Sequence, residues 1–133
     1  MTLVSEGKLA EAEAEYRAVL AIKERVLGPA DYGIQITRTD LADLLEAQGN
    51  HAEAETELRA VLSACERDLG PEAPQTASAC YRLAICLKCR AKTAEALKFA
   101  RRYLDICSGS LPAHDHWARQ ARELVQELEQ AQL

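Results

Sequence analysis

The chain has 133 residues, 48% of them hydrophobic and 28% charged, which is enough to bury a core and unlike the composition of a disordered segment. Its net charge of −5 argues against nucleic acid as a partner, because an acidic surface repels phosphate. No stretch reaches the roughly 20 apolar residues of a membrane helix, and the first residues lack the features of a signal peptide. Five cysteines without the spacing of a disulfide framework fit a reducing compartment, so we expect a cytoplasmic protein.

Helix-forming residues predominate, and glycine and proline fall between segments with helical periodicity. Taken in chain order, these segments predict six helices at about residues 7–27, 31–48, 50–69, 73–90, 92–108 and 114–131. The second, fourth and sixth segments place their apolar residues on one helix face, and we expect that face to be buried. These residues are Leu41, Ala42, Leu45, Leu83, Ala84, Leu87, Ala121, Leu124, Val125 and Leu128.

A repeat with a period of 42 residues organises the chain. Residues 7–29 and 49–71 are identical at 15 of 23 aligned positions, and residues 91–112 form a weaker third copy. We therefore predict one domain over 1–133, with a partial repeat at 1–29, repeats at 30–71 and 72–112, and a C-terminal capping helix at 113–133. Stacked helix pairs of this kind form an all-α, right-handed superhelix of about six antiparallel helices, with a continuous core and a concave face.

The repeated residues also carry a family resemblance. The runs AEAE, YRAVL and ERVLGP within residues 10–29, with Leu41-Ala42, Leu45, Gln48-Gly49 and Ala54, resemble the 42-residue tetratricopeptide repeat (TPR) of kinesin light chains. The resemblance implies a protein–protein interaction module that is not an enzyme and holds no cofactor. Thr39-Asp40 and Tyr81-Arg82 stand where light chains carry an asparagine pair, so no light chain's partner specificity is implied.

The resemblance implies that the first helix of each pair lines the concave surface and binds a peptide or protein partner. The positions that match by phase are Thr39, Asp43, Glu46, Tyr81, Ile85, Lys88, Arg122 and Gln126. Residues 30–48 and 72–90 are identical only at Leu41, Ala42 and Leu45, which favours an asymmetric ligand, although exposed surface can also drift freely. Without the asparagines that clamp a terminal carboxylate, we expect a peptide with an apolar anchor near Tyr81 and Ile85.

The first repeat lacks most of its first helix, because Met1–Glu6 aligns only with the last turn, residues 43–48. An exposed second helix shows its apolar face to water. The sequence therefore favours a piece of a longer array, in a larger scaffold or signalling protein. The alternative is a structural module that forms a homodimer through this edge.

Two short patterns invite a chemical interpretation. Cys86 and Cys89 form a CxxC pair near Cys80, but a second ligand pair for zinc is absent, so we expect these cysteines to pack in the core. His114-Asp115-His116 fits the start of a helix better than a metal site. No phosphate-binding loop or nucleophile motif occurs. We therefore predict no catalytic residue, no metal and no cofactor.

Overall fold

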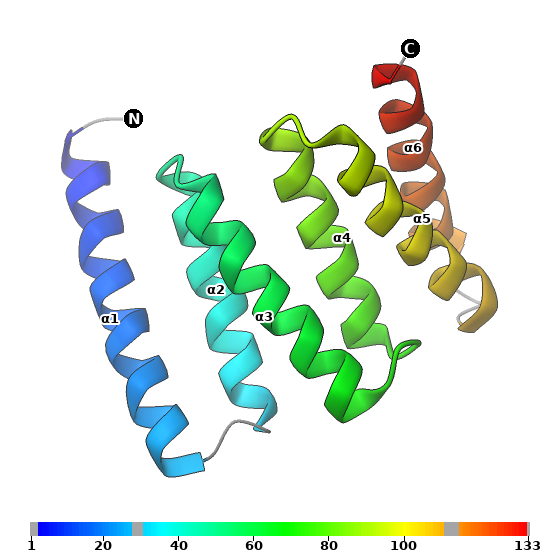
Figure 1. The fold of residues 1–133 in the computed structure, drawn as a ribbon. Helices are drawn as coiled ribbons and strands as arrows, with labels where there is room; N and C mark the ends of the chain where they lie inside the picture. Colours follow the sequence, from blue (N-terminus) through cyan, green and yellow to red (C-terminus); the bar gives the residue numbers. More distant parts are fainter. Residues whose placement is uncertain (1–2, 28–30, 111–114, 133) are drawn as a thin grey trace. The chain divides into compact units, whose positions relative to one another are not determined.

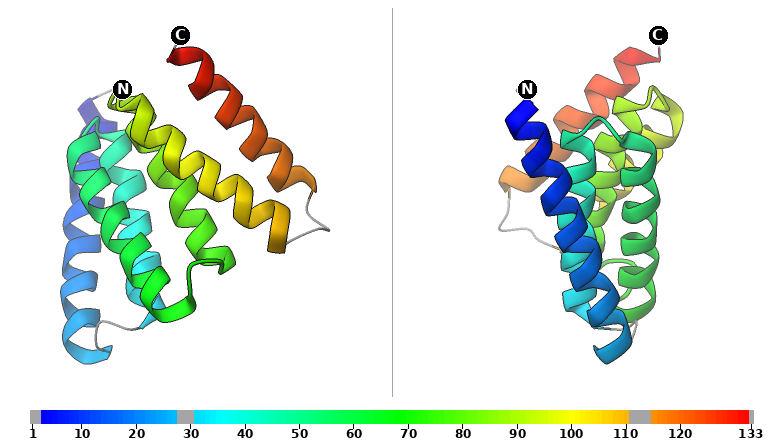
Figure 2. Two further views of the ribbon diagram at one scale, coloured as in Figure 1. Left: turned by 45° about the vertical axis from the view of Figure 1, so that its right-hand side comes forward. Right: turned by 90° about the vertical axis from the view of Figure 1, so that its left-hand side faces the viewer.

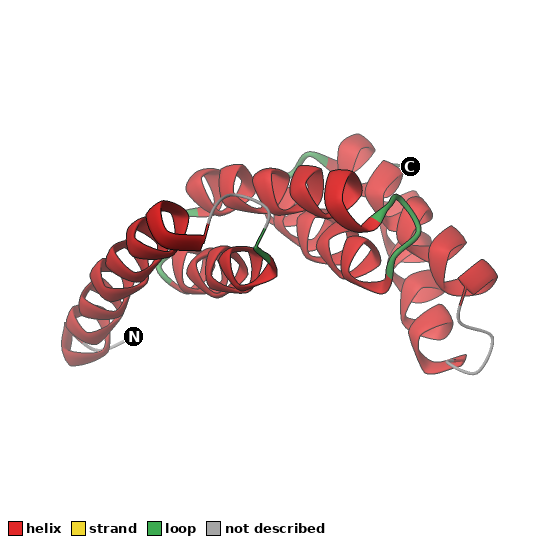
Figure 3. Cartoon of the chain, turned by 90° about the horizontal axis from the view of Figure 1, so that it is seen from below, coloured by secondary structure: helices red, strands yellow, loops and turns green. Residues whose placement is uncertain are grey.

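The computed structural model describes residues 3–27, 31–110 and 115–132, and within these ranges the chain is helical without strands (Figures 1 and 3). The prediction of an all-α fold is confirmed. The helices are α1 (Leu3–Leu27), α2 (Tyr32–Ala47), α3 (His51–Leu69), α4 (Pro74–Cys89), α5 (Thr93–Ser110) and α6 (Asp115–Ala131).

The helix boundaries agree with the predicted ones within two residues, except at the start of α1. We expected α1 to begin at Gly7, because Gly7 aligns with the turn at Gly49. In the structure α1 is continuous from Leu3 through Gly7. A glycine inside a helix costs only about 1 kcal/mol relative to alanine, so the local sequence alone does not force a break there.

The first of two compact units comprises residues 1–64, and in it α1 packs against α2. Ile34, Leu41 and Leu45 of α2 are fully buried, as is Leu58 of α3. Charged side chains connect the three helices at the edge of this core. The Arg38 guanidinium of α2 lies 2.7 Å from a Glu24 carboxylate oxygen of α1 and 3.9 Å from one of Glu57 on α3.

The second unit comprises residues 65–133, and in it α5 packs against both α4 and α6. In Figure 2, left, α5 and α6 run side by side. The predicted apolar faces of α4 and α6 are both buried. Their buried residues include Leu83, Ala84 and Leu87 of α4 and Ala121, Leu124, Val125 and Leu128 of α6.

The turns after α2 and α4 have the same backbone geometry. The backbone N–H of Asn50 donates to the Leu45 carbonyl at 2.8 Å, and that of Lys92 donates to the Leu87 carbonyl at 2.9 Å. In both turns the residue after the helix is left-handed, at Gly49 (φ 83°) and at Ala91 (φ 60°). A left-handed alanine is strained by its Cβ atom, whereas glycine is not.

Replacing Ala91 with glycine should therefore stabilise the protein. We expect Ala91→Gly to raise the free energy of unfolding by about 0.5–1 kcal/mol, because relief of strain exceeds the entropy that glycine adds to the unfolded chain. Gly49→Ala, at the equivalent turn, should lower it by a similar amount. Urea denaturation followed by circular dichroism measures both, and a destabilised Ala91→Gly variant would contradict the argument.

Candidate functional site

The face of α2 predicted to bind a partner differs among its residues in accessibility. Asp43 is exposed, whereas Thr39 is half-buried and its hydroxyl donates to the Gln35 carbonyl at 2.8 Å. Glu46 is half-buried, and its Oε1 atom is buried without a hydrogen-bond partner among the described residues. The most exposed apolar side chain on this face is one that the sequence analysis missed. Ile36, two turns before Asp43, is 49% exposed.

Tyr81 of α4 lies in a cluster that joins three helices of the second unit. Its ring centroid lies 5.0 Å from that of Tyr103 on α5, and its hydroxyl accepts a hydrogen bond from Gln120 Nε2 on α6 at 3.0 Å. The Tyr103 hydroxyl donates to Gln120 Oε1 at 3.4 Å. Burial, with a further contribution from the neighbouring Cys107, raises the pKa of Tyr103 above its usual value. Tyr81 is therefore part of the packing as well as a candidate binding residue.

The other candidates of the second unit lie along α4 and α6. Ile85 is half-buried one turn after Tyr81, and one turn further Lys88 forms an ion pair with Glu127 of α6. Arg122 and Gln126 are exposed, and Arg122 forms no ion pair with any described residue. The two pairs Tyr81–Gln120 and Lys88–Glu127 align α4 with α6, so Ile85 lies between two polar links.

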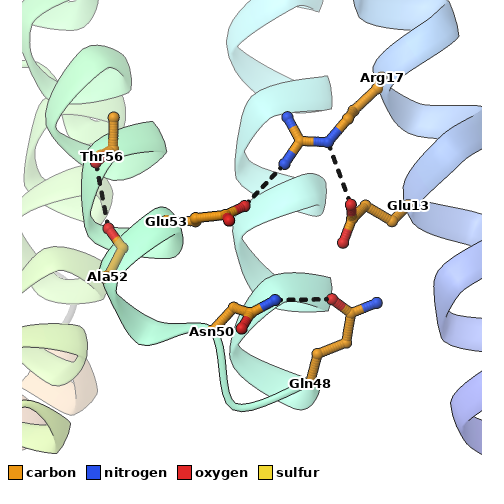
Figure 4. A network of polar contacts seen from close by, with 7 residues as sticks. All are labelled: Glu13, Arg17, Gln48, Asn50, Ala52, Glu53 and Thr56. Carbon is orange, nitrogen blue, oxygen red and sulfur yellow. Dashed lines mark hydrogen bonds and ion pairs between the residues drawn. The ribbon is translucent and has the colours of Figure 1, made fainter.

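The early glutamates of α1 and α3 hold helices of the first unit together (Figure 4). Arg17 of α1 lies 3.3 Å from Glu13 on its own helix and 3.0 Å from Glu53 on α3. Glu55 of α3 is buried and pairs with Arg59 at 2.9 Å. These exposed or partly exposed pairs contribute about 0–1 kcal/mol each, so their effect is mainly on how the helices pair.

The five cysteines are free thiols, and all except Cys89 are buried. Burial is the main cause that raises the pKa of Cys65, of Cys107 and of Cys80, the last to about 11. A raised pKa keeps a thiol protonated and unreactive. The expectation that Cys80 and Cys86 pack in the core is confirmed, whereas Cys89 lies on the surface.

Among the residues whose side chains are described, no group of three or more His, Cys, Asp and Glu could hold a metal ion. The predicted pattern at residues 114–116 lies outside the described side chains. No helix in the described ranges is both long and apolar enough to cross a membrane.

Two tetratricopeptide repeat models match the chain, one over residues 33–108 and the other over residues 1–31. No curated protein matches it. Tetratricopeptide repeats are generally protein-interaction modules, and their family members are generally scaffolds without enzymatic activity.

Solved structures agree on the fold. BtubC (BKLC) from P. vanneervenii is 18% identical, with a TM-score of 0.83 over 94% of this chain and 50% of that one. A Podosopora anserina protein with nearly identical TPR-like repeats of the kinesin light chain kind is 23% identical, with a TM-score of 0.75 over 93% of this chain and 64% of that one. A variant of it gives 20%, 0.74, 96% and 68%.

The chain thus spans between half and about two thirds of the length of these structures, and their fold is an α-α superhelix. The match of the family model covers more than half of the chain. The repeat period of 42 residues and the turns after α2 and α4 agree with it. The chain belongs to the tetratricopeptide repeat family, and its repeats are of the kinesin-light-chain-like type.

Proposed function

We propose that this chain binds a peptide or protein partner through the groove-lining faces of the first helices of its repeats. There are two such faces, one in each unit. The α2 face consists of Ile36, Thr39, Asp43 and Glu46. The α4–α6 face consists of Tyr81, Ile85, Lys88, Arg122 and Gln126.

One observation carries the proposal: the repeats keep the buried side of these helices and vary the accessible side. Leu41, Ala42 and Leu45 of α2 recur as Leu83, Ala84 and Leu87 of α4, and all six are buried to 1% exposure or less. Thr39, Asp43 and Glu46 become Tyr81, Ile85 and Lys88. A scaffold with fixed packing and a varied accessible surface suits an asymmetric ligand.

The chemistry of the α4–α6 face favours a partner with one apolar and one acidic side chain. Ile85 is only half-covered by the protein and supplies the apolar contact. Arg122 is exposed, so its guanidinium is available to a carboxylate. Binding energy at such surfaces concentrates in a few apolar and arginine contacts, so these two residues should dominate.

The α2 face has the opposite charge. Ile36 is exposed, and Asp40 and Asp43 follow it on the same side of the helix, one and two turns later. We expect this face to prefer an apolar side chain next to a lysine or arginine.

A peptide library panned against the protein tests the α4–α6 face. Enriched peptides should carry an apolar residue near an Asp or Glu. Their affinity should fall about tenfold or more for Ile85→Ser and for Arg122→Glu, because each change removes a central contact. Isothermal titration calorimetry measures the dissociation constants.

Two comparisons make this test specific. Tyr81→Ala is unsuitable, because it also breaks the cluster with Tyr103 and Gln120. Ile22→Ser, which changes an exposed isoleucine on α1, is the matched control and should leave the affinity unchanged. If no peptide is enriched, or if the enriched peptides bind Ile85→Ser and Arg122→Glu as well as the wild type, the α4–α6 face is not the binding site.

A further inference from the structure

An apolar stripe runs along the outer side of α1, away from the groove-lining faces. Val19, Ile22 and Val26 follow one another at helical spacing and are 42%, 52% and 69% exposed. Contacts of α1 with the rest of its unit come from another side of the helix, where Lys23 donates to Thr37 at 2.9 Å and Glu24 pairs with Arg38. The stripe is therefore the uncovered face of a packed helix.

The repeat itself shows that this face is normally covered. Val19 corresponds to Val61 and to Tyr103, and Ile22 corresponds to Ala64 and to Ile106, all of which are buried. In the second unit the ring of Tyr103 is covered by Tyr81 of α4. Positions that lie against a helix in two copies of the repeat are thus open to solvent in the first copy. A helix is the natural occupant of the stripe on α1.

The charges that flank the stripe favour α1 of a second copy as that helix. Two antiparallel α1 helices related by a twofold axis, with Val19 of one copy against Ile22 of the other, bring Glu15 level with Arg25 of the partner copy. Glu15 and Arg25 are both exposed, and neither pairs with another described residue. A twofold axis repeats every contact, so one interface contains two such ion pairs.

We propose that the chain forms a symmetric homodimer through α1, with a core of Val19, Ile22 and Val26 and reciprocal Glu15–Arg25 ion pairs at its edges. The apolar stripe is short, so the dimer forms and dissociates with concentration. This surface is separate from both proposed partner-binding faces. Dimerisation and peptide binding can therefore succeed or fail independently.

Sedimentation equilibrium of the complete 133-residue chain, from about 1 µM to about 1 mM under reducing conditions, tests the proposal. The wild type should shift from monomer to dimer within this range. Ile22→Asp should raise the dissociation constant of the dimer by about tenfold or more, because a carboxylate would be buried among apolar side chains. Ile36→Asp, at an exposed isoleucine on α2, is the matched control and should dimerise like the wild type.

Charge exchange identifies the partner as a second copy in this register. Glu15→Arg alone and Arg25→Glu alone each bring like charges together and should weaken the dimer. The double variant restores opposite charges and should dimerise like the wild type, and a mixture of the two single variants should form heterodimers. Circular dichroism checks that every variant is folded. A wild type that stays monomeric at all concentrations, a dimer insensitive to Ile22→Asp, or a double variant as weak as the single ones would overturn the proposal.

Discussion

Leu83→Ala should lower the free energy of unfolding by about 3–5 kcal/mol, because it empties a fully buried position in the packed interior of the second unit. Leu83 has no exposed surface, and its neighbours Ala84 and Leu87 on α4 are equally inaccessible. The cost combines lost burial of the side chain with the cavity that remains. Urea denaturation followed by circular dichroism measures the change.

Leu69→Ala is the matched control for Leu83→Ala. Leu69 ends α3 and is 44% exposed, so its removal leaves little cavity and should cost about 1 kcal/mol or less. Equal losses for the two variants would show that Leu83 does not occupy a closely packed position.

Tyr103→Ala should lower the free energy of unfolding by about 3–5 kcal/mol. The ring is buried against Tyr81, and its hydroxyl donates to Gln120, so the substitution removes contacts to both α4 and α6. Tyr103→Phe keeps the ring and should cost about 1 kcal/mol, the usual contribution of one hydrogen bond. Thermal and urea denaturation of both variants separate the ring from the hydroxyl.

The hydroxyl of Tyr103 adds a pH dependence to this comparison. Its pKa is raised in the folded protein, so in the unfolded chain the hydroxyl ionises first. The wild type should therefore lose stability as the pH rises above about 10, and Tyr103→Phe should lose less over the same range. If both proteins lose stability equally above this pH, Tyr103 does not hold its proton in the folded state.

The helices and their buried faces could be predicted from the sequence because both follow from local periodicity. Leu41, Ala42 and Leu45 recur 42 residues later, and a repeated apolar triplet at helical spacing has to face a core. The turn at Gly49 could be predicted from its glycine. The equivalent turn at Ala91 could be located only because the repeat aligns the two positions.

The surroundings of individual side chains could not be predicted, since they depend on contacts between helices. Tyr81 was expected to be an apolar anchor, but the sequence does not show that Gln120, 39 residues later, binds its hydroxyl. The glutamates of α3 were expected to be solvated, yet Glu55 is buried beside Arg59. Ile36 was overlooked because its counterpart in the next repeat is the small polar residue Ser78.

The single surface thiol gives the protein a natural attachment point for a fluorescent label. Cys89 is the last residue of α4, next to Lys88 of the α4–α6 face, and the other four cysteines are buried. A maleimide dye would therefore attach next to the proposed binding face without any engineered residue, and its emission would report on an arriving ligand. The same thiol could crosslink two molecules in air, so a reducing agent has to be present whenever molecular mass is measured.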